Sequence, residues 1–357
     1  MRTKTALLAT LAATLTVAAA HANSDQYLRT GEPIRWHRRA VTFMVDPSMR
    51  DSSLSDPIAV IGRAASTWAG IANAPRYDLR EGSIGTIGYD SARPDANISG
   101  IAMYHQNFPR RVDRQVLALT LLTRNSVTGE IVDADIILDA ESNRFAVLSD
   151  LGMPGVATAP NDYQNVITHE IGHSLGLTED TDHRDATMYP SSQPGEVSKR
   201  RLAQTDVDSV RRAYAAVMTD GEPLPPGGCG GASVVPRTGL ANGRMALAFV
   251  GVALLALLAG RSRKSKVALY VGAAALVVLG APEPGPYVMR YARVLSANTY
   301  FLRGVMVTRA TVVDHAGVRT VERVGGRVGA LEQTAYDIPS GTELVPGRAV
   351  VLAPSER

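Results

Sequence analysis

The chain has little of the material that several classes of protein require. Its 357 residues include one cysteine, Cys229, so no disulfide can form within the chain. Aromatic residues are 5% of the sequence, which is too few for the base-stacking surfaces of single-strand binders. The net charge is only +3, so we expect no nucleic-acid partner. What is present, 45% hydrophobic and 20% charged residues, is typical of a globular protein with two or three domains.

The N-terminal residues 1–22 have the pattern of a secretory signal peptide. Arg2 and Lys4 precede an apolar stretch, Ala6 to Ala20, and Ala20-His21-Ala22 fits a small-x-small cleavage site. A core helix is the alternative, but the stretch has no polar face. We therefore expect an exported protein.

Two further apolar runs, residues 245–260 and 267–281, flank a turn with four basic side chains at 261–266. Neither run carries a charge, and a basic turn is typical of the cytoplasmic side of a membrane. We therefore expect a transmembrane helical hairpin over 245–281, after a Pro/Gly linker at 219–244. Both flanking parts would then lie on the periplasmic or extracellular side. The alternatives are two buried helices, or release of a soluble protein by cleavage in the linker.

Between the signal peptide and the linker, the hydrophobic periodicity predicts a domain of class α+β over residues 23–218. After the hairpin, residues 286–357 contain short β-like runs separated by glycine and proline, which indicates a small all-β domain. The predicted elements of the first domain are a strand at 40–46, a helix at 57–72, strands at 116–123 and 131–138, and helices at 161–177 and 202–217.

The residues that indicate chemistry are concentrated at His169-Glu170-Ile171-Gly172-His173. Histidines four residues apart lie on one face of a helix, about one turn from each other, so both imidazoles can bind one zinc ion. Glu170 follows the first histidine and is placed to take a proton from an attacking water as a general base. The motif predicts metal-assisted hydrolysis.

A catalytic zinc needs a third protein ligand and one open position. Gly176, three residues after His173, allows the chain to leave the helix through a positive φ and return to the metal. Met188-Tyr189-Pro190 follows. Together these residues resemble the metzincin metalloproteases, in particular the matrixin branch.

The resemblance extends over about residues 34–217 and implies a twisted mixed sheet, an active-site helix, a Met-turn at Met188, Tyr189 and Pro190, and a C-terminal helix. It implies Zn²⁺ as the cofactor and a protein or peptide as the substrate. Asp206 would accept hydrogen bonds from the backbone of the Met-turn. The strand at 116–123 would be an edge strand that takes an extended peptide by strand addition.

The sequence departs from the family pattern at the third ligand. Position 179, ten residues after His169, is Glu179 and not histidine. Counting back from Met188 gives Asp180, and His183 offers a nitrogen four residues beyond Glu179. We favour Glu179, because a carboxylate oxygen ligates zinc at distances similar to those of imidazole. The isolated histidines His37, His105 and His315 are expected to be structural or exposed.

The sequence therefore predicts an exported, membrane-anchored zinc endopeptidase whose ligands are His169, His173 and Glu179 and whose general base is Glu170. The alternative is a non-catalytic surface or adhesion protein with a degenerate metzincin domain. Only the change at position 179 supports that alternative.

Overall fold

The computed structural model describes residues 26–215 and 290–352, apart from short gaps at 51–53, 55, 86, 95–96, 107, 109–115 and 303–304. The expected signal peptide at 1–22, linker at 219–244 and membrane hairpin at 245–281 lie outside these residues. Within the described part of the chain, no helix combines the length and the apolar character needed to cross a membrane.

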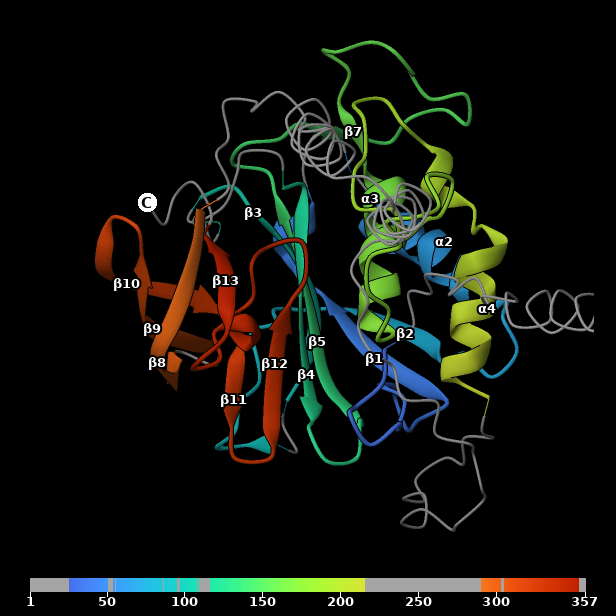
Figure 1. Ribbon diagram of the computed structural model, residues 1–357. Helices are drawn as coiled ribbons and strands as arrows, with labels where there is room; N and C mark the ends of the chain where they lie inside the picture. Colours follow the sequence, from blue (N-terminus) through green and yellow to red (C-terminus); the bar gives the residue numbers. More distant parts are fainter. Residues whose placement is uncertain are drawn as a thin grey trace, which may run out of the picture. The chain divides into compact units, whose positions relative to one another are not determined.

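A seven-stranded mixed sheet forms the centre of the protein (Figure 1). The four strands at one side of it are parallel, while β4 and β12 each run antiparallel to both of their neighbours. The strand order is β11-β12-β4-β5-β3-β1-β2. The bounds are β1 (Ala40–Val45), β2 (Arg76–Glu81), β3 (Ser99–Tyr104), β4 (Ala118–Asn125), β5 (Ile131–Asp139), β11 (Gly326–Val328) and β12 (Leu331–Ala335).

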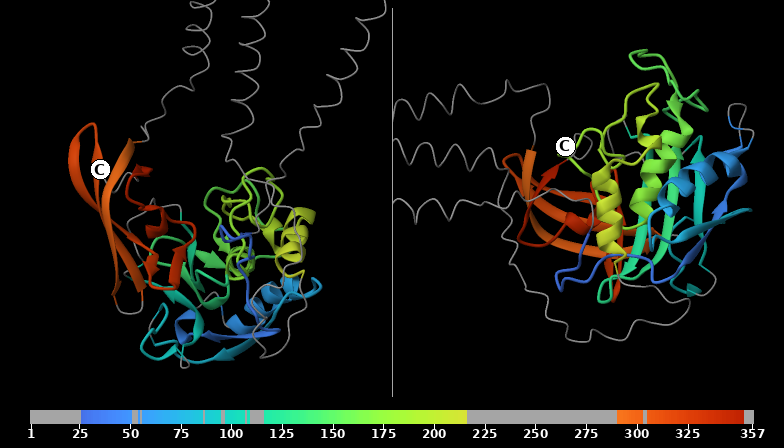
Figure 2. Two further views of the ribbon diagram at one scale, coloured as in Figure 1. Left: turned by 60° about the horizontal axis from the view of Figure 1, so that its bottom comes forward. Right: turned by 90° about the vertical axis from the view of Figure 1, so that its right-hand side faces the viewer.

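Three α-helices, α2 (Pro57–Ala69), α3 (Tyr163–Ser174) and α4 (Gln204–Ala213), lie on one side of this sheet (Figure 2). Polar side chains fix where the first two begin. Asp56 accepts a hydrogen bond from Ala59 N at 3.0 Å, and Asp162 accepts one from Asn165 N at 2.8 Å. The predicted helices are therefore present, each shorter by a few residues at one or both ends than the periodicity indicated.

The largest hydrophobic cluster fills the space between the sheet and the helices. Its largest fully buried side chains include Trp36, Trp68, Tyr163 and Tyr214. Their polar atoms are satisfied by backbone groups in several cases. Trp68 Nε1 donates to Thr168 O at 2.8 Å, and Tyr214 Oη donates to Leu175 O at 3.0 Å. These bonds tie α3 to its surroundings and limit its movement along the sheet.

Residues 286–357 were expected to form a separate β domain, and the described strands of this segment do so only in part. Strands β8 (Arg290–Leu302), β9 (Val305–Asp314), β10 (Gly317–Val324) and β13 (Ala349–Leu352) do form a sheet of their own, in the order β10-β9-β8-β13. Strands β11 and β12, however, extend the central sheet, because β12 pairs with β4. The strand at 116–123 was expected to be an edge strand, and this was wrong from Leu121 onward, where β12 pairs with it. The C-terminal strands thus belong to the same compact unit as the helices.

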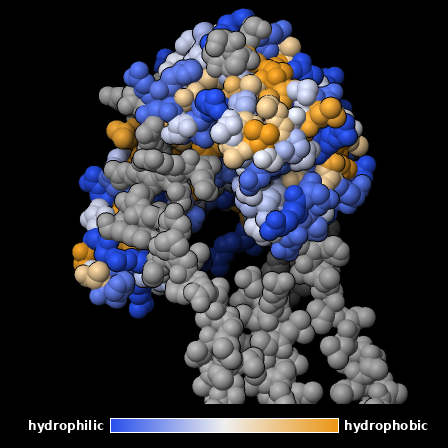
Figure 3. All heavy atoms as spheres, turned by 90° about the horizontal axis from the view of Figure 1, so that it is seen from above, coloured by the Kyte–Doolittle hydropathy of each residue, from blue (hydrophilic) through white to orange (hydrophobic). Residues whose placement is uncertain are grey.

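A two-stranded sheet, β6 (Phe145–Ala146) with β7 (Asn161–Asp162), precedes α3. The loop between these strands rises at the top of Figure 1 and exposes Leu151, Met153 and Val156. Seen from above, this face of the protein is mostly hydrophilic, with smaller groups of hydrophobic residues among the polar ones (Figure 3).

Strand β5 buries two carboxyl groups where it passes β3. Asp135 accepts from Gly88 N at 2.5 Å and from Gly100 N at 2.8 Å, and Asp133 accepts from Ser99 Oγ at 3.0 Å. Both side chains are fully buried. Burial raises the pKa of Asp133 to about 6, and burial together with the charge of Asp133 raises the pKa of Asp135 well above its usual range.

The raised pKa predicts a specific dependence of stability on pH. Because the folded state holds the Asp133 proton more tightly than the unfolded state does, the free energy of unfolding falls as the pH rises from about 4 through about 6. Asp133→Asn lacks this charge, so its stability relative to wild type should increase by the order of 1 kcal/mol between pH 4 and pH 7. Urea unfolding at both pH values measures it. Asp78→Asn, at an exposed position, is the control. The prediction would be contradicted if the stability of Asp133→Asn relative to wild type were the same at pH 4 and pH 7.

Candidate active site

Helix α3 places His169 and His173 one turn apart, with their rings 4.8 Å apart between centroids and nearly perpendicular. Each ring is oriented by a backbone carbonyl. The Nδ1 atom of His169 is 2.7 Å from Thr187 O, and that of His173 is 2.9 Å from Leu177 O. An Nδ1–H that donates to a carbonyl leaves the Nε2 lone pair free to bind a metal. Both Nε2 atoms therefore face the same space.

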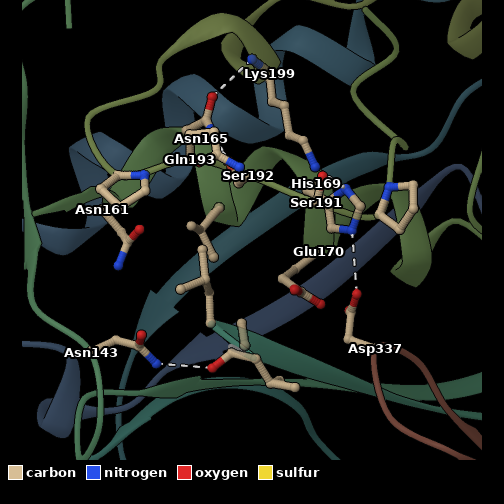
Figure 4. A pocket seen from close by; sticks show the side chains of 16 residues that line it. Asn143, Asn161, Asn165, His169, Glu170, Ser191, Ser192, Gln193, Lys199 and Asp337 are labelled. Atoms are coloured by element: carbon tan, nitrogen blue, oxygen red, sulfur yellow. Dashed lines mark hydrogen bonds and ion pairs between the residues drawn. The ribbon is translucent and has the colours of Figure 1, made fainter. Parts of the chain in front are cut away.

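Two carboxylates lie across this space from the histidines. Glu179 Oε1 is 3.8 Å from His169 Nε2 and 3.5 Å from His173 Nε2. Asp337 approaches the same nitrogen atoms at 3.6 Å and 3.5 Å. One possible ligand atom from each of the four residues lies within 4.8 Å of the others. Figure 4 shows Asp337 pointing at His169 from a segment far along the chain.

The donor set fits a zinc ion. Two imidazoles and carboxylate oxygens are ordinary zinc ligands. Several of the facing atoms are buried and have no hydrogen-bond partner among the described residues: His173 Nε2, Glu179 Oε2 and Asp337 Oδ2. Burial lowers the pKa of His169, but the Asp337 and Glu179 carboxylates outweigh it and raise this pKa to about 9. The same carboxylates that favour a proton on these imidazoles would favour a divalent cation in its place, bound by the deprotonated Nε2 atoms.

Glu170 is buried beside this cluster and is held by strand β4. Thr120 Oγ1 donates to Glu170 Oε2 at 2.5 Å. Burial and the nearby Asp337 carboxylate raise the pKa of Glu170 to about 7. A carboxylate with a pKa in this range can both accept and return a proton near neutral pH.

The exit of the chain from α3 depends on Gly176, which has a φ of +91°. A Cβ at this position would lie 2.3 Å from Ile34 O, so the close backbone approach admits only glycine. The chain reverses here as the sequence predicted, and it brings Glu179 back to the two histidines. Asp180 N then donates to Met188 O at 2.8 Å, which closes the loop.

Met188 is fully buried, and its side chain packs directly on α3 at Gly172. A Cβ on Gly172 would be 2.2 Å from Met188 Sδ, so the contact requires glycine on that face of α3. Asp206 accepts from Thr187 N at 2.8 Å and from Met188 N at 3.2 Å. This is the contact with the Met-turn that the resemblance implied. It also holds Thr187, whose carbonyl orients His169.

The other two candidates for the third ligand lie elsewhere. Asp180 turns away and accepts from His183 N at 3.1 Å, and its carboxylate is 2.9 Å from His183 Nδ1. His183 is partly exposed and outside the cluster. The structure thus brings Glu179, and not Asp180 or His183, to the histidine pair. The isolated His37, His105 and His315 are also outside the cluster.

A cavity of about 480 Å³ opens beside His169 and Glu170. Tyr189 lies outside its lining, while the neighbouring Pro190 forms part of its wall. Asparagine, glutamine and serine residues form part of its lining, and Asn143 donates to Val116 O at 2.9 Å at one side (Figure 4). The lining residues include Val116, Leu117, Ala118, Asn143, Asn161, Asn165, Ser191, Ser192, Gln193 and Lys199.

Two residues of the site were not predicted from the sequence. Thr120 lies within the strand predicted at 116–123, but nothing in a strand pattern marks one threonine as a partner of Glu170. Asp337 lies in the segment that was predicted to form a separate domain. No local motif marks it, because its place in the site follows from the pairing of β12 with β4.

Comparison with known proteins agrees with the geometry. A family model described as matrixin, Peptidase M10, matches residues 35–215, about half of the chain. Metalloendoproteinase 1 of Glycine max is 47% identical over 57 residues. This match covers 16% of the present chain and 18% of the plant protein, so the chain matches less than a fifth of that relative's length. The family match confirms the resemblance seen in the sequence.

The third ligand can be tested by zinc affinity. Glu179→Ala removes one of the four donors and leaves His169, His173 and Asp337, so we expect the affinity to fall by at least about tenfold. His183→Ala and the exposed Asp185→Ala should leave it within about twofold of wild type. Competition with a chromophoric chelator measures all three. Loss of zinc from His183→Ala, with retention by Glu179→Ala, would assign the site to three histidines.

Proposed function

The chain belongs to the matrixin family, and on this premise we propose that it is a zinc-dependent endopeptidase that cleaves protein or peptide substrates. The observation that carries the proposal is the convergence of four groups. His169, His173 and Glu179 face one point, and the buried Glu170 lies beside them with the cavity in front.

The residues have distinct roles in the proposed hydrolysis. His169, His173 and Glu179 would hold zinc, which when bound supplies Lewis acidity that polarises a carbonyl and acidifies water. Glu170 accepts the proton from the attacking water and returns it to the leaving amine. Thr120 keeps the Glu170 carboxylate in place through its hydrogen bond. Asp206 acts indirectly, since it positions the turn whose Thr187 carbonyl orients His169.

The cavity supports a peptide as substrate. One wall is the start of strand β4 with the residues before it, and the opposite wall follows the Met-turn through Pro190 and Ser191. An extended chain between these walls would pass directly over Glu170. A strand at one wall and polar side chains such as Asn161 and Gln193 could hydrogen-bond a peptide main chain, which suits recognition that is tolerant of sequence.

The general base is tested by Glu170→Gln. The amide preserves size and can accept the hydrogen bond from Thr120, but it cannot take a proton, so hydrolysis should fall by about 10³-fold while zinc is retained. Cleavage of casein and zinc content per protein are the two measurements. Glu81→Gln, at a partly exposed position on β2, is the control. Cleavage by Glu170→Gln at the wild-type rate would remove Glu170 from this role.

We also propose that the protein is exported and anchored in a membrane by residues 245–281, with both flanking parts on the periplasmic or extracellular side. The sequence supports this proposal in two places. Residues 1–22 have the pattern of a signal peptide, and two uncharged apolar runs flank a basic turn.

Added protease tests this topology. In intact spheroplasts, digestion should reach both residues 26–215 and residues 290–352, while a cytoplasmic marker protein stays intact. Protection of 290–352 alone would mean that the second run does not cross the membrane, and protection of both parts would mean that the protein is not exported.

A further inference from the structure

The side of strand β4 that faces away from β5 is occupied by the chain itself. Strand β12 pairs with it antiparallel, with Leu331 opposite Asn125 and Ala335 opposite Leu121. The pairing continues beyond β12, because Tyr336 N donates to Thr120 O at 2.9 Å. Thr120 is the residue that holds Glu170, so the paired segment reaches the centre of the proposed active site.

Side chains fix the register of this pairing. Arg124 Nη2 and Glu332 Oε1 form an ion pair at 2.5 Å, and both side chains are largely buried. Gln333 Nε2 donates to Thr123 Oγ1 at 3.1 Å, and Gln333 is fully buried. These contacts are specific, as expected of a segment that docks in one position.

The segment ends over the metal-binding residues. The Tyr336 ring stacks on His173, with centroids 4.4 Å apart and planes 12° apart, and its hydroxyl donates to Gln26 Oε1 at 3.0 Å. The next residue, Asp337, directs its carboxylate at His169 and His173. Asp337 has a φ of +64°, a left-handed conformation that is uncommon for a residue with a side chain.

The left-handed turn distinguishes this segment from a bound substrate. A substrate would continue along the cavity beside Glu170, whereas the chain turns at Asp337 and continues to the short helix Gly341–Glu343, which packs near β11 and β12. Asp337 contributes only one side of the cavity lining. The segment therefore covers the metal-binding residues without placing a peptide bond across the site.

A catalytic zinc uses three protein ligands and keeps the fourth position for water or substrate. His169, His173 and Glu179 would supply three ligands, and the Asp337 carboxylate lies where it would supply a fourth. A zinc ion held by all four groups would then have no open position. The two carboxylates would also neutralise the charge of a Zn²⁺ ion, which weakens its ability to polarise a carbonyl.

We propose that residues 331–337, here called the covering segment, are a built-in inhibitor of the peptidase. The segment fills the strand position of a peptide beside β4, and Asp337 closes the metal site. This inference rests on the proposed function, because it specifies how that same site is regulated. Since the segment is part of the chain, its effective concentration at the site is high, and opening requires displacement or cleavage of the C-terminal part.

Two sets of full-length variants test the proposal. Asp337→Ala removes the fourth ligand, with the exposed Asp185→Ala as its matched control. Glu332→Arg places like charges opposite each other at the pairing with Arg124, far from the metal ligands, and so should detach β12. The double variant Arg124→Glu with Glu332→Arg restores an ion pair and should return the protein to the closed form. This rescue separates detachment from misfolding.

The first measurement does not depend on hydrolysis. A labelled peptide with the sequence of residues 329–338 is added to zinc-loaded protein carrying Glu170→Gln, and binding is followed by fluorescence polarisation. We expect Glu332→Arg, in that background, to bind it at least about tenfold more tightly than the Glu170→Gln parent, whereas Asp337→Ala keeps the contacts of β12 with β4 and should bind it like the parent. The charge-swapped double variant is assayed with a peptide that carries Glu332→Arg, so that the charge opposite position 124 is again complementary, and it should bind this peptide as weakly as the parent binds the wild-type peptide. Hydrogen exchange at residues 121–125 should rise in Glu332→Arg and return in the double variant.

The second measurement is hydrolysis of casein by the same variants with Glu170 intact. Both opening variants should cleave about tenfold faster than wild type or more, with zinc content unchanged. Loss of zinc from Asp337→Ala would make Asp337 a required ligand and would overturn the proposal. So would rapid exchange at 121–125 in wild type. If no variant cleaves casein but binding and exchange follow the expected pattern, the covering segment stands and the peptidase assignment fails.

Discussion

The site depends on the reversal of the chain at Gly176. The helix α3 ends at Ser174, one residue after its second histidine, and the positive φ of Gly176 lets the backbone pass within contact of Ile34. A carbonyl at the end of the helix is used, because Trp36 Nε1 donates to Ser174 O, and Leu177 O, which lies beyond the reversal, orients His173. The same reversal sends Glu179 back to the helix. The end of the helix and the position of this ligand therefore depend on the same turn.

The second constraint is electrostatic. Three carboxyl groups and two imidazoles lie in a buried space, where like charges repel strongly and each ionised group is costly unless it is paired. The pKa of Glu170 rises to about 7 and that of Asp337 is held well below its usual range by the histidines, although burial alone would raise it. Protonated histidines can pair with these carboxylates, and a divalent cation bound between the same groups would also offset their charge. Asp206 under the Met-turn and Thr120 on β4 fix the geometry in which such a cation would be held.

The local parts of this site could be predicted from the sequence, and the long-range parts could not. His169, Glu170 and His173 lie in one helical motif. Gly176 and Met188 follow at spacings that indicate a reversal of the chain and a Met-turn. The sequence left Glu179, Asp180 and His183 open, because the path of a loop is set by contacts such as the Asp180 N to Met188 O bond, which no spacing encodes. The pairing of β12 with β4 joins segments some 200 residues apart, and strand patterns do not specify partners at that distance. Residues 286–357 were therefore expected to form a separate domain, and Asp337 was not expected near the site.

The pairing register explains why so small a feature as one aspartate can reach the metal ligands. Residues in a strand advance by about 3.3 Å each, and side chains on one face repeat every second residue, so a shift of β12 along β4 by two residues would move Asp337 by about 7 Å. That shift is larger than the distances that now join Asp337 to the two histidines. The Arg124–Glu332 ion pair and the Gln333–Thr123 hydrogen bond oppose it, since both would be broken and their buried groups left without partners. Because a paired backbone is stiff, polar contacts at the far end of β12 thus fix the position of Asp337 at the metal-binding residues.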